Sequence, residues 1–178
     1  GGGHEGIFRM RLRLIGGVAA LCAGLIVGLS GPARAAERFT DAPLLGLTLG
    51  YFDVIGQEFP SLEGRLELRA NNDWWLKPFG GVMANTERAA HIYAGVYAEL
   101  FWGEHFYVSP SFAPGIYMKG NSRDLGYPLE FRSQIELGWR FDSGIRASVS
   151  LNHISNAGLG QNPGTESVAF SVLLPLSF

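Results

Sequence analysis

Beyond residue 35 the chain alternates between apolar and polar positions with a period of two, which is the pattern of β-strands. Apolar content is high at 47%, yet after residue 35 no uninterrupted apolar stretch is long enough for a membrane helix. The alternation marks eight segments, at roughly 44–55, 62–71, 74–85, 90–102, 105–117, 128–142, 144–155 and 165–178. Dispersed apolar residues of this kind favour strands that cross a membrane over helices that do.

The polar face of these segments carries opposite charges in close succession. In 62–71, leucines occupy one face, and the other face presents Glu63, Arg65, Glu67 and Arg69. A soluble β-sandwich also alternates, but its water-facing surface needs no such pairing. A narrow interior filled by ion pairs and hydrogen bonds does need it, so the pattern favours a barrel.

The connections between segments, and the last residue, point the same way. Tight turns are predicted at 72–73, 103–104 and 142–144, and longer loops at 56–61, 118–127 and 157–164. Short turns on one side and longer loops on the other are typical of outer-membrane barrels. Aromatic residues gather near segment ends, as interface belts do, and Phe178 closes an apolar strand as in outer-membrane proteins. We predict an all-β fold: one eight-stranded antiparallel transmembrane β-barrel in the bacterial outer membrane, with a filled interior.

Residues 1–35 are expected to lie outside this fold. Met10 is followed by arginines and an apolar run, and Ala33-Arg34-Ala35 supplies the small residues that a signal peptidase recognises. We therefore predict a signal peptide at 10–35, preceded by extra residues 1–9, and a single barrel domain at 36–178. An N-terminal membrane anchor is the alternative. The one cysteine, Cys22, precedes the predicted cleavage point, so the exported part would hold no disulfide.

Charge limits the range of partners. The formal net charge is −2 and no basic run is present, so nucleic acid is not an expected partner. The expected partners are the membrane itself and its lipids, and a homodimer is left open.

The candidate chemistry lies where two predicted strands flank the last loop. His153 and Ser155 share a face with Leu151, because residues two apart on a strand point the same way. Glu166 lies on the outward face of the next strand, at the same end. A polar side chain on a lipid-facing wall is costly, so three together suggest a task.

Arranged as a triad, the three residues take definite roles. Ser155 would be the nucleophile, His153 the base, and Glu166 the group that orients the imidazole. Donors for the oxyanion remain open among backbone amides near Ala157 and Gly158 and the side chains of Asn156 and Asn162. Taken singly, a histidine or serine at a strand end is usually structural, and we interpret His91 and His105 in that way.

The sequence His153-Ile154-Ser155-Asn156-Ala157-Gly158-Leu159, followed by Gln161, Asn162, Gly164 and Glu166-Ser167, resembles the lipid A 3-O-deacylase (PagL) family. That resemblance implies an eight-stranded outer-membrane barrel with a Ser-His-Glu triad on its outer face. It also implies hydrolysis of the ester-linked 3-hydroxyacyl chain at position 3 of lipid A, in lipopolysaccharide of the outer leaflet, without metal or other cofactor. The loop before Glu166 is slightly shorter than the family pattern, which leaves the role of Asn162 open.

Two other classes of function compete with this esterase. A non-catalytic small barrel, for adhesion or structure, would be expected to carry long polar external loops, and these loops are modest. Another membrane-lipid enzyme, a phospholipase or an acyltransferase, could use the same triad, since water and an alcohol compete for one acyl-enzyme.

Overall fold

The protein is described by a computed structural model that covers residues 42–70 and 74–176. All of these residues belong to the compact unit Ala36–Phe178. The strands are β1 (Leu44–Phe52), β2 (Ser61–Arg69), β3 (Lys77–Asn85), β4 (Ala90–Tyr97), β5 (Leu100–Trp102), β6 (Phe106–Met118), β7 (Leu129–Arg140), β8 (Arg146–Ser155) and β9 (Thr165–Pro175). The predicted signal peptide, the turn at 72–73 and Phe178 lie outside the described residues.

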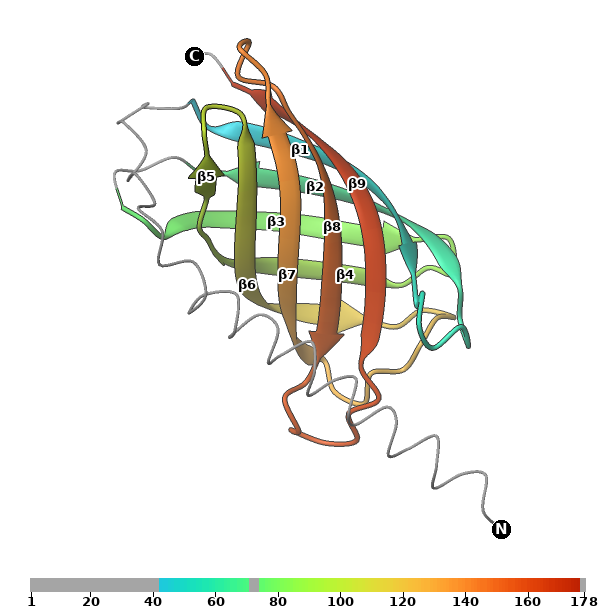
Figure 1. Cartoon of the computed structure of the whole chain (residues 1–178). Helices are drawn as coiled ribbons and strands as arrows, with labels where there is room; N and C mark the ends of the chain where they lie inside the picture. Colours follow the sequence, from blue (N-terminus) through green and yellow to red (C-terminus); the bar gives the residue numbers. More distant parts are fainter. Residues whose placement is uncertain (1–41, 71–73, 177–178) are drawn as a thin grey trace, which may run out of the picture. The chain divides into compact units, whose positions relative to one another are not determined.

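The strands form one closed antiparallel barrel (Figure 1). Strands that follow one another in sequence pair, except that β4 and β5 both pair with β6 and not with each other; β9 pairs with β1. Because β4 and β5 occupy one position in the wall, the barrel has the predicted eight-stranded architecture.

The division of the predicted 90–102 strand into β4 and β5 has a local cause on β6. Tyr97 pairs with Ser111 and Leu100 with Val108, so the register continues unchanged across the gap. Within the gap, Ala98 N–H donates to the carbonyl of Pro110 at 3.0 Å. Proline has no N–H to return a hydrogen bond, so the ladder is interrupted there without a shift of register.

Burial along the strands is inverted relative to a soluble protein. On β2 the buried residues are Ser61, Glu63, Arg65, Glu67 and Arg69, and the residues between them are exposed. Leucines therefore cover the outside of the wall, and charged side chains fill its interior. This arrangement is what a membrane-spanning barrel requires.

Ion pairs and hydrogen bonds fill the lumen. Arg69 bridges Glu136 at 2.6 Å and Glu67 at 3.1 Å, and Tyr107 donates to Glu136 at 2.8 Å. Arg132 also pairs with Glu67, at 3.0 Å. These charges are almost wholly buried and come from strands on different sides of the barrel. The prediction of an interior filled by paired charges is confirmed.

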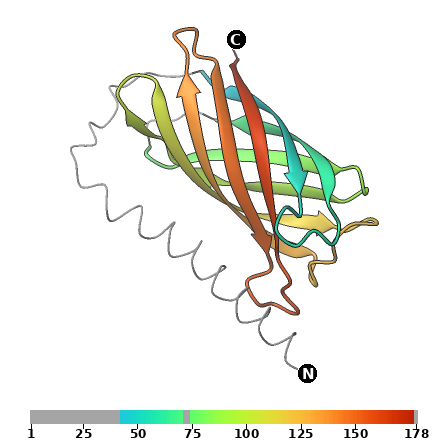
Figure 2. The ribbon, with the colours of Figure 1, turned by 45° about the vertical axis from the view of Figure 1, so that its right-hand side comes forward.

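The two ends of the barrel differ. The β7–β8 turn and the end of β9 lie at one end, whereas the 156–164 loop and the connection from β1 to β2 lie at the other (Figures 1 and 2). The short connections at 103–105 and 141–145 lie at the same end as the start of β1 and the end of β9. The longer loops at 53–60, 119–128 and 156–164 share the second, which we call the loop end.

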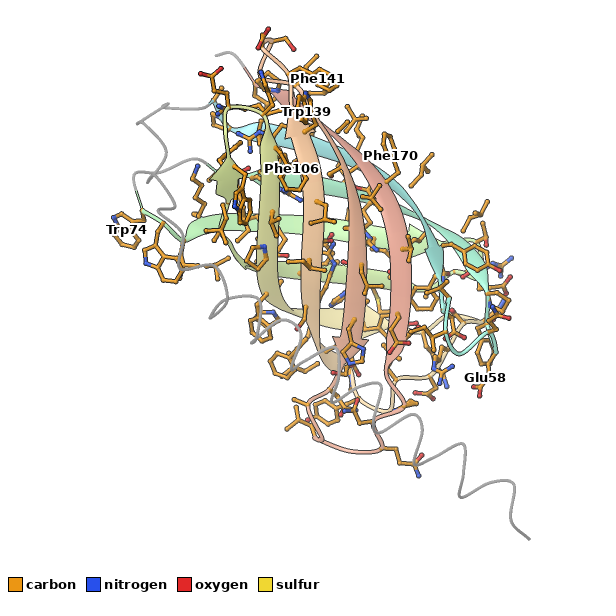
Figure 3. The ribbon with its side chains drawn as sticks, in the orientation of Figure 1. Glu58, Trp74, Phe106, Trp139, Phe141 and Phe170 are labelled. Atoms are coloured by element: carbon orange, nitrogen blue, oxygen red, sulfur yellow. The ribbon has the colours of Figure 1, made fainter. Side chains whose placement is uncertain are left out.

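Aromatic side chains gather on the outer surface of the barrel at the end opposite the loop end. Trp139 and Phe106 lie there with Phe141 (Figure 3). Trp139 stacks on His105 with ring centroids 5.0 Å apart, and the ring centroids of Phe106 and Trp102 are 6.1 Å apart. Within residues 42–70 and 74–176, no helix is long and apolar enough to span a membrane.

Candidate active site

The end of β8 turns two polar side chains outward. Its burial alternates, with Ser150, Asn152 and Ile154 buried in the lumen and the residues between them partly exposed on the outer wall. His153 and Ser155 fall in that outer set, after Val149 and Leu151. The strand therefore places both side chains where the alternation predicted, on the outer face at the loop end.

Glu166 joins this pair from the neighbouring strand. His153 and Glu166 are direct partners in the β8–β9 ladder, so their side chains leave the sheet side by side. His153 Nδ1 lies 3.0 Å from Glu166 Oε1, and their side chains are 22% and 16% exposed. With the proton on Nδ1 donated to the carboxylate, the lone pair of Nε2 is free to accept another proton.

Ser155, the third residue of the predicted site, lies two residues from His153 along the same strand. A rise of about 3.3 Å per residue puts its Cα about 6.6 Å from that of His153. An imidazole and a hydroxymethyl group can span that distance. In the described part of the chain no hydrogen bond joins Ser155 Oγ to the His153 ring. Catalytic contacts of this kind often close only when substrate binds.

The loop after Ser155 is held by Asn156, whose side chain is fully buried. Its Nδ2 donates to the carbonyls of Leu125 and Gln161, at 2.9 and 2.8 Å, and its Oδ1 accepts from Gly158 N–H at 3.0 Å. Both amide hydrogens are thus used in joining the 156–164 loop to the 119–128 loop. Asn156 positions the loop and has no side-chain hydrogen left for an oxyanion.

The other predicted oxyanion donors separate into two groups. Gly158 N–H is already bonded to Asn156 Oδ1, and Asn162 Oδ1 accepts from Asn156 N–H at 3.1 Å. Among the described residues, Ala157 N–H and Asn162 Nδ2 make no hydrogen bond. These two remain available as donors on the exposed side of the loop.

A buried carboxylate fixes the start of β9 beside the site. Asp53 accepts from Glu58 N–H and Phe59 N–H at 2.9 Å, and Arg123 Nη1 pairs with it at 3.1 Å. Thr165 Oγ1 donates to the same carboxylate at 3.3 Å. The Asp53 side chain therefore ties two loops to the residue that precedes Glu166. Sequence patterning did not single out Asp53, because Arg123 and Thr165 lie far away from it in the chain.

A second serine borders His153 on the other side and was not predicted. Ser133 on β7 is exposed on the outer wall and pairs directly with His153 in the β7–β8 ladder. Phe131, two residues earlier, is the partner of Ser155 and stacks on Phe112 with centroids 5.8 Å apart. The signal for Ser133 was present in the alternation, as a polar residue at an outward position.

The other two histidines of the described residues, His91 and His105, stand apart from this site. His91 is buried in the lumen on β4, and His105 at the opposite end of the barrel contacts the Arg140 carbonyl at 2.9 Å. Within the described ranges, no group of three or more His, Cys, Asp or Glu side chains is arranged as metal ligands would be.

Comparison with known proteins identifies the family to which this chain belongs. The model of the lipid A 3-O-deacylase (PagL) family matches residues 57–175, which include all three residues of the site. The chain belongs to the PagL family. This membership and the closed barrel place it in the bacterial outer membrane. The comparison with curated protein sequences found no match.

Solved structures agree on the fold of this PagL-family protein. The crystal structure of the outer membrane enzyme PagL superposes with a TM-score of 0.63 at 21% identity, covering 75% of this chain and 99% of that one. A de novo designed transmembrane β-barrel gives 0.57 at 8% identity, covering 79% and 99%. Neisserial surface protein A gives 0.54 at 7%, covering 78% and 98%. At these identities the likeness shows the fold alone.

Proposed function

We propose that this protein hydrolyses the ester-linked 3-hydroxyacyl chain at position 3 of lipid A, with Ser155 as nucleophile, His153 as general base and Glu166 as the orienting carboxylate. The observation that carries the proposal is the 3.0 Å contact between His153 Nδ1 and Glu166 on the outer wall, beside Ser155. With Nδ1 of His153 held in this way, the lone pair of Nε2 is available to accept the proton of Ser155.

The reaction follows from these positions. Ser155 Oγ attacks the ester carbonyl while Nε2 of His153 takes its proton, and the tetrahedral oxyanion forms beside the 156–164 loop. Collapse breaks the ester bond, and the proton on Nε2 goes to the departing sugar oxygen. Water then attacks the acyl-enzyme with the same base, releasing a 3-hydroxy fatty acid and restoring Ser155. Glu166 stabilises the imidazolium at both stages.

The oxyanion is assigned to the two donors that the loop leaves unused, Ala157 N–H and Asn162 Nδ2. Both lie within the loop that follows the nucleophile, where such donors are effective. Asn156 supports them indirectly, since it fixes the loop to Leu125 and Gln161.

The surrounding wall suits an acyl chain. Phe131 is the ladder partner of Ser155, and its stack on Phe112 presents a continuous apolar surface next to the nucleophile. A lipid whose head lies at the membrane surface could reach the triad by lateral movement within the outer leaflet. Its ester would then meet Ser155 while its chain lies against this aromatic pair.

Mass spectrometry of lipid A from cells that express the protein tests the proposal. We expect loss of one 3-hydroxyacyl chain with the unmodified protein and no loss with Ser155→Ala or His153→Ala. Ser133→Ala is the matched control, because it removes a hydroxyl that also neighbours His153. Unchanged lipid A with a correctly inserted, unmodified barrel would reject the proposal. Activity that survives Ser155→Ala and disappears with Ser133→Ala would reject the choice of nucleophile.

A further inference from the structure

We propose that Gly164 is a positioning residue for the imidazole of His153, because the ring occupies the space that any side chain at residue 164 would need. The inference rests on the proposed function, since it concerns the same triad. Gly164 ends the 156–164 loop and directly precedes Thr165, the first residue of β9. Ile154 pairs with Thr165 in the ladder, so Gly164 lies level with Ser155.

The distances define the contact. A Cβ atom placed on Gly164 would lie 3.0 Å from Cε1 and 3.6 Å from Nε2 of the His153 ring. Carbon atoms in favourable contact are about 3.5–4.0 Å apart, so such a Cβ would require the ring to shift by a few tenths of an ångström. The edge of the imidazole that carries the reactive nitrogen thus borders the space that a side chain at residue 164 would enter.

The opposite nitrogen is fixed at the same time. Nδ1 is held by Glu166 at 3.0 Å, so the ring lies between a carboxylate and a residue without a side chain. This arrangement keeps Nε2 at the level of Ser155, where a base must be to take the hydroxyl proton. The lack of a side chain at 164 is, on this account, part of the catalytic geometry.

The backbone conformation of residue 164 could also explain why it is glycine. This explanation must be separated from the contact with the His153 ring. Its φ is +61°, a left-handed conformation that L-residues adopt at some cost. Asparagine tolerates this conformation better than alanine, yet it carries the same Cβ. Gly103, in the turn at the opposite end, has a φ of +69° and no heavy atom within 4 Å of a Cβ. Gly103→Ala therefore reproduces the backbone strain without touching the site.

The experiment compares Gly164→Ala, Gly164→Asn and Gly103→Ala as full-length barrels in detergent micelles with lipid A as substrate. Folding is checked by the heat-dependent shift in gel mobility. Both Gly164 variants should lose about tenfold or more in kcat with KM within twofold of the unmodified value. The rate at which a fluorophosphonate labels Ser155 should fall by a similar factor. Gly103→Ala should match the unmodified protein in all three measurements.

Several results would overturn the inference. Recovery of the original kcat in Gly164→Asn would show that backbone strain, not the Cβ, explains the glycine. A change confined to KM, or an unchanged labelling rate, would show that the imidazole is not displaced. If the unmodified protein released no acyl chain, or if Ser155→Ala hydrolysed normally, the proposed function itself would fail. If hydrolysis required Ser155 but kcat were unchanged by Gly164→Ala, only the positioning role of Gly164 would be rejected.

Discussion

The lumen and the outer wall of this barrel treat polar side chains in opposite ways. Inside, each charge of the Arg69–Glu136 pair has several partners, including Glu67 and the Tyr107 hydroxyl. Outside, most of the wall is apolar, and its polar side chains near the loop end include His153, Ser155 and Glu166. Only the last two strands contribute to that outer triad.

The difference separates stability from chemistry. A buried charge that loses its partner is strongly destabilising, so the lumen network is needed to keep the barrel closed. A polar side chain on the outer wall gains little from folding and is disfavoured by lipid. If His153, Ser155 and Glu166 form the proposed triad, the two regions should respond to substitution in opposite ways.

The largest expected effect on activity is in the triad base. His153→Ala should reduce lipid A hydrolysis by about 10³-fold or more, because the nucleophile loses its proton acceptor. The free energy of unfolding should change little, since the side chain lies on the outer wall. Deacylation kinetics and urea unfolding in lipid vesicles, measured on the same preparation, check both parts. A variant that lost stability and activity together would break the comparison.

The largest expected effect on stability is in the lumen. Glu136→Gln removes the charge that pairs with Arg69 and should cost about 3 kcal/mol of unfolding free energy. Urea titration of the refolded barrel measures this, with the deacylation rate per folded molecule as the second readout. That rate should stay within twofold of the unmodified value. A stability unchanged by the substitution would contradict the role given to the network.

A smaller effect is expected from the orienting carboxylate. Glu166→Gln keeps the shape of the side chain but loses its charge, so kcat should fall about a hundredfold, which corresponds to about 2.7 kcal/mol of transition-state stabilisation. Unfolding should be nearly unaffected. Steady-state kinetics with purified lipid A provides the measurement. A drop seen only in KM would mean that Glu166 contacts substrate and does not act through His153.

The aromatic wall beside Ser155 should matter less than the triad. Phe131→Ala removes the ring that stacks on Phe112 and should lower kcat/KM about tenfold, mainly through KM. Phe106→Ala, on the same outer surface at the opposite end, is the matched control for lost aromatic area. Comparable losses of kcat/KM in both variants would argue against an acyl-binding surface at Phe131.

The smallest effect is expected at an exposed ion pair of the loop end. Lys119 donates to Asp124 at 2.6 Å and lowers the pKa of that carboxyl, helped by the Gly126 N–H. The small contribution of this ion pair to stability is present above the ordinary pKa of an aspartate. It is lost as the pH falls through the lowered pKa of Asp124. Both side chains are more than half exposed, so Lys119→Ala should leave activity and the neutral-pH unfolding curve unchanged.

Local patterning predicted what depends on neighbours in sequence. Alternation along 62–71 and 144–155 identified the strands, their inward charges and the outward His153 and Ser155, because a period of two fixes the face of each residue. Glu166 followed from the same rule on the next strand. The family resemblance also rests on the residues around His153, Ser155 and Glu166, and the family model includes them.

Contacts between distant segments could not be predicted in this way. The gap between β4 and β5 is caused by Pro110 on a different strand, and nothing within 90–102 announces it. The sequence offers Asn156 as an oxyanion donor, but Leu125, from another loop, accepts one of its side-chain hydrogens. Gly164 and Ser133 gained their significance only from the ladder that brings each one to His153.

The packed lumen has a consequence for the cell that carries this enzyme. An envelope enzyme with an open channel would admit antibiotics and bile salts in proportion to its abundance. Among the described residues, guanidinium and carboxylate groups of β2 and β7 meet across the interior, as expected for an eight-stranded barrel whose side chains fill it. We therefore expect that additional copies of this barrel add no open channels to the outer membrane.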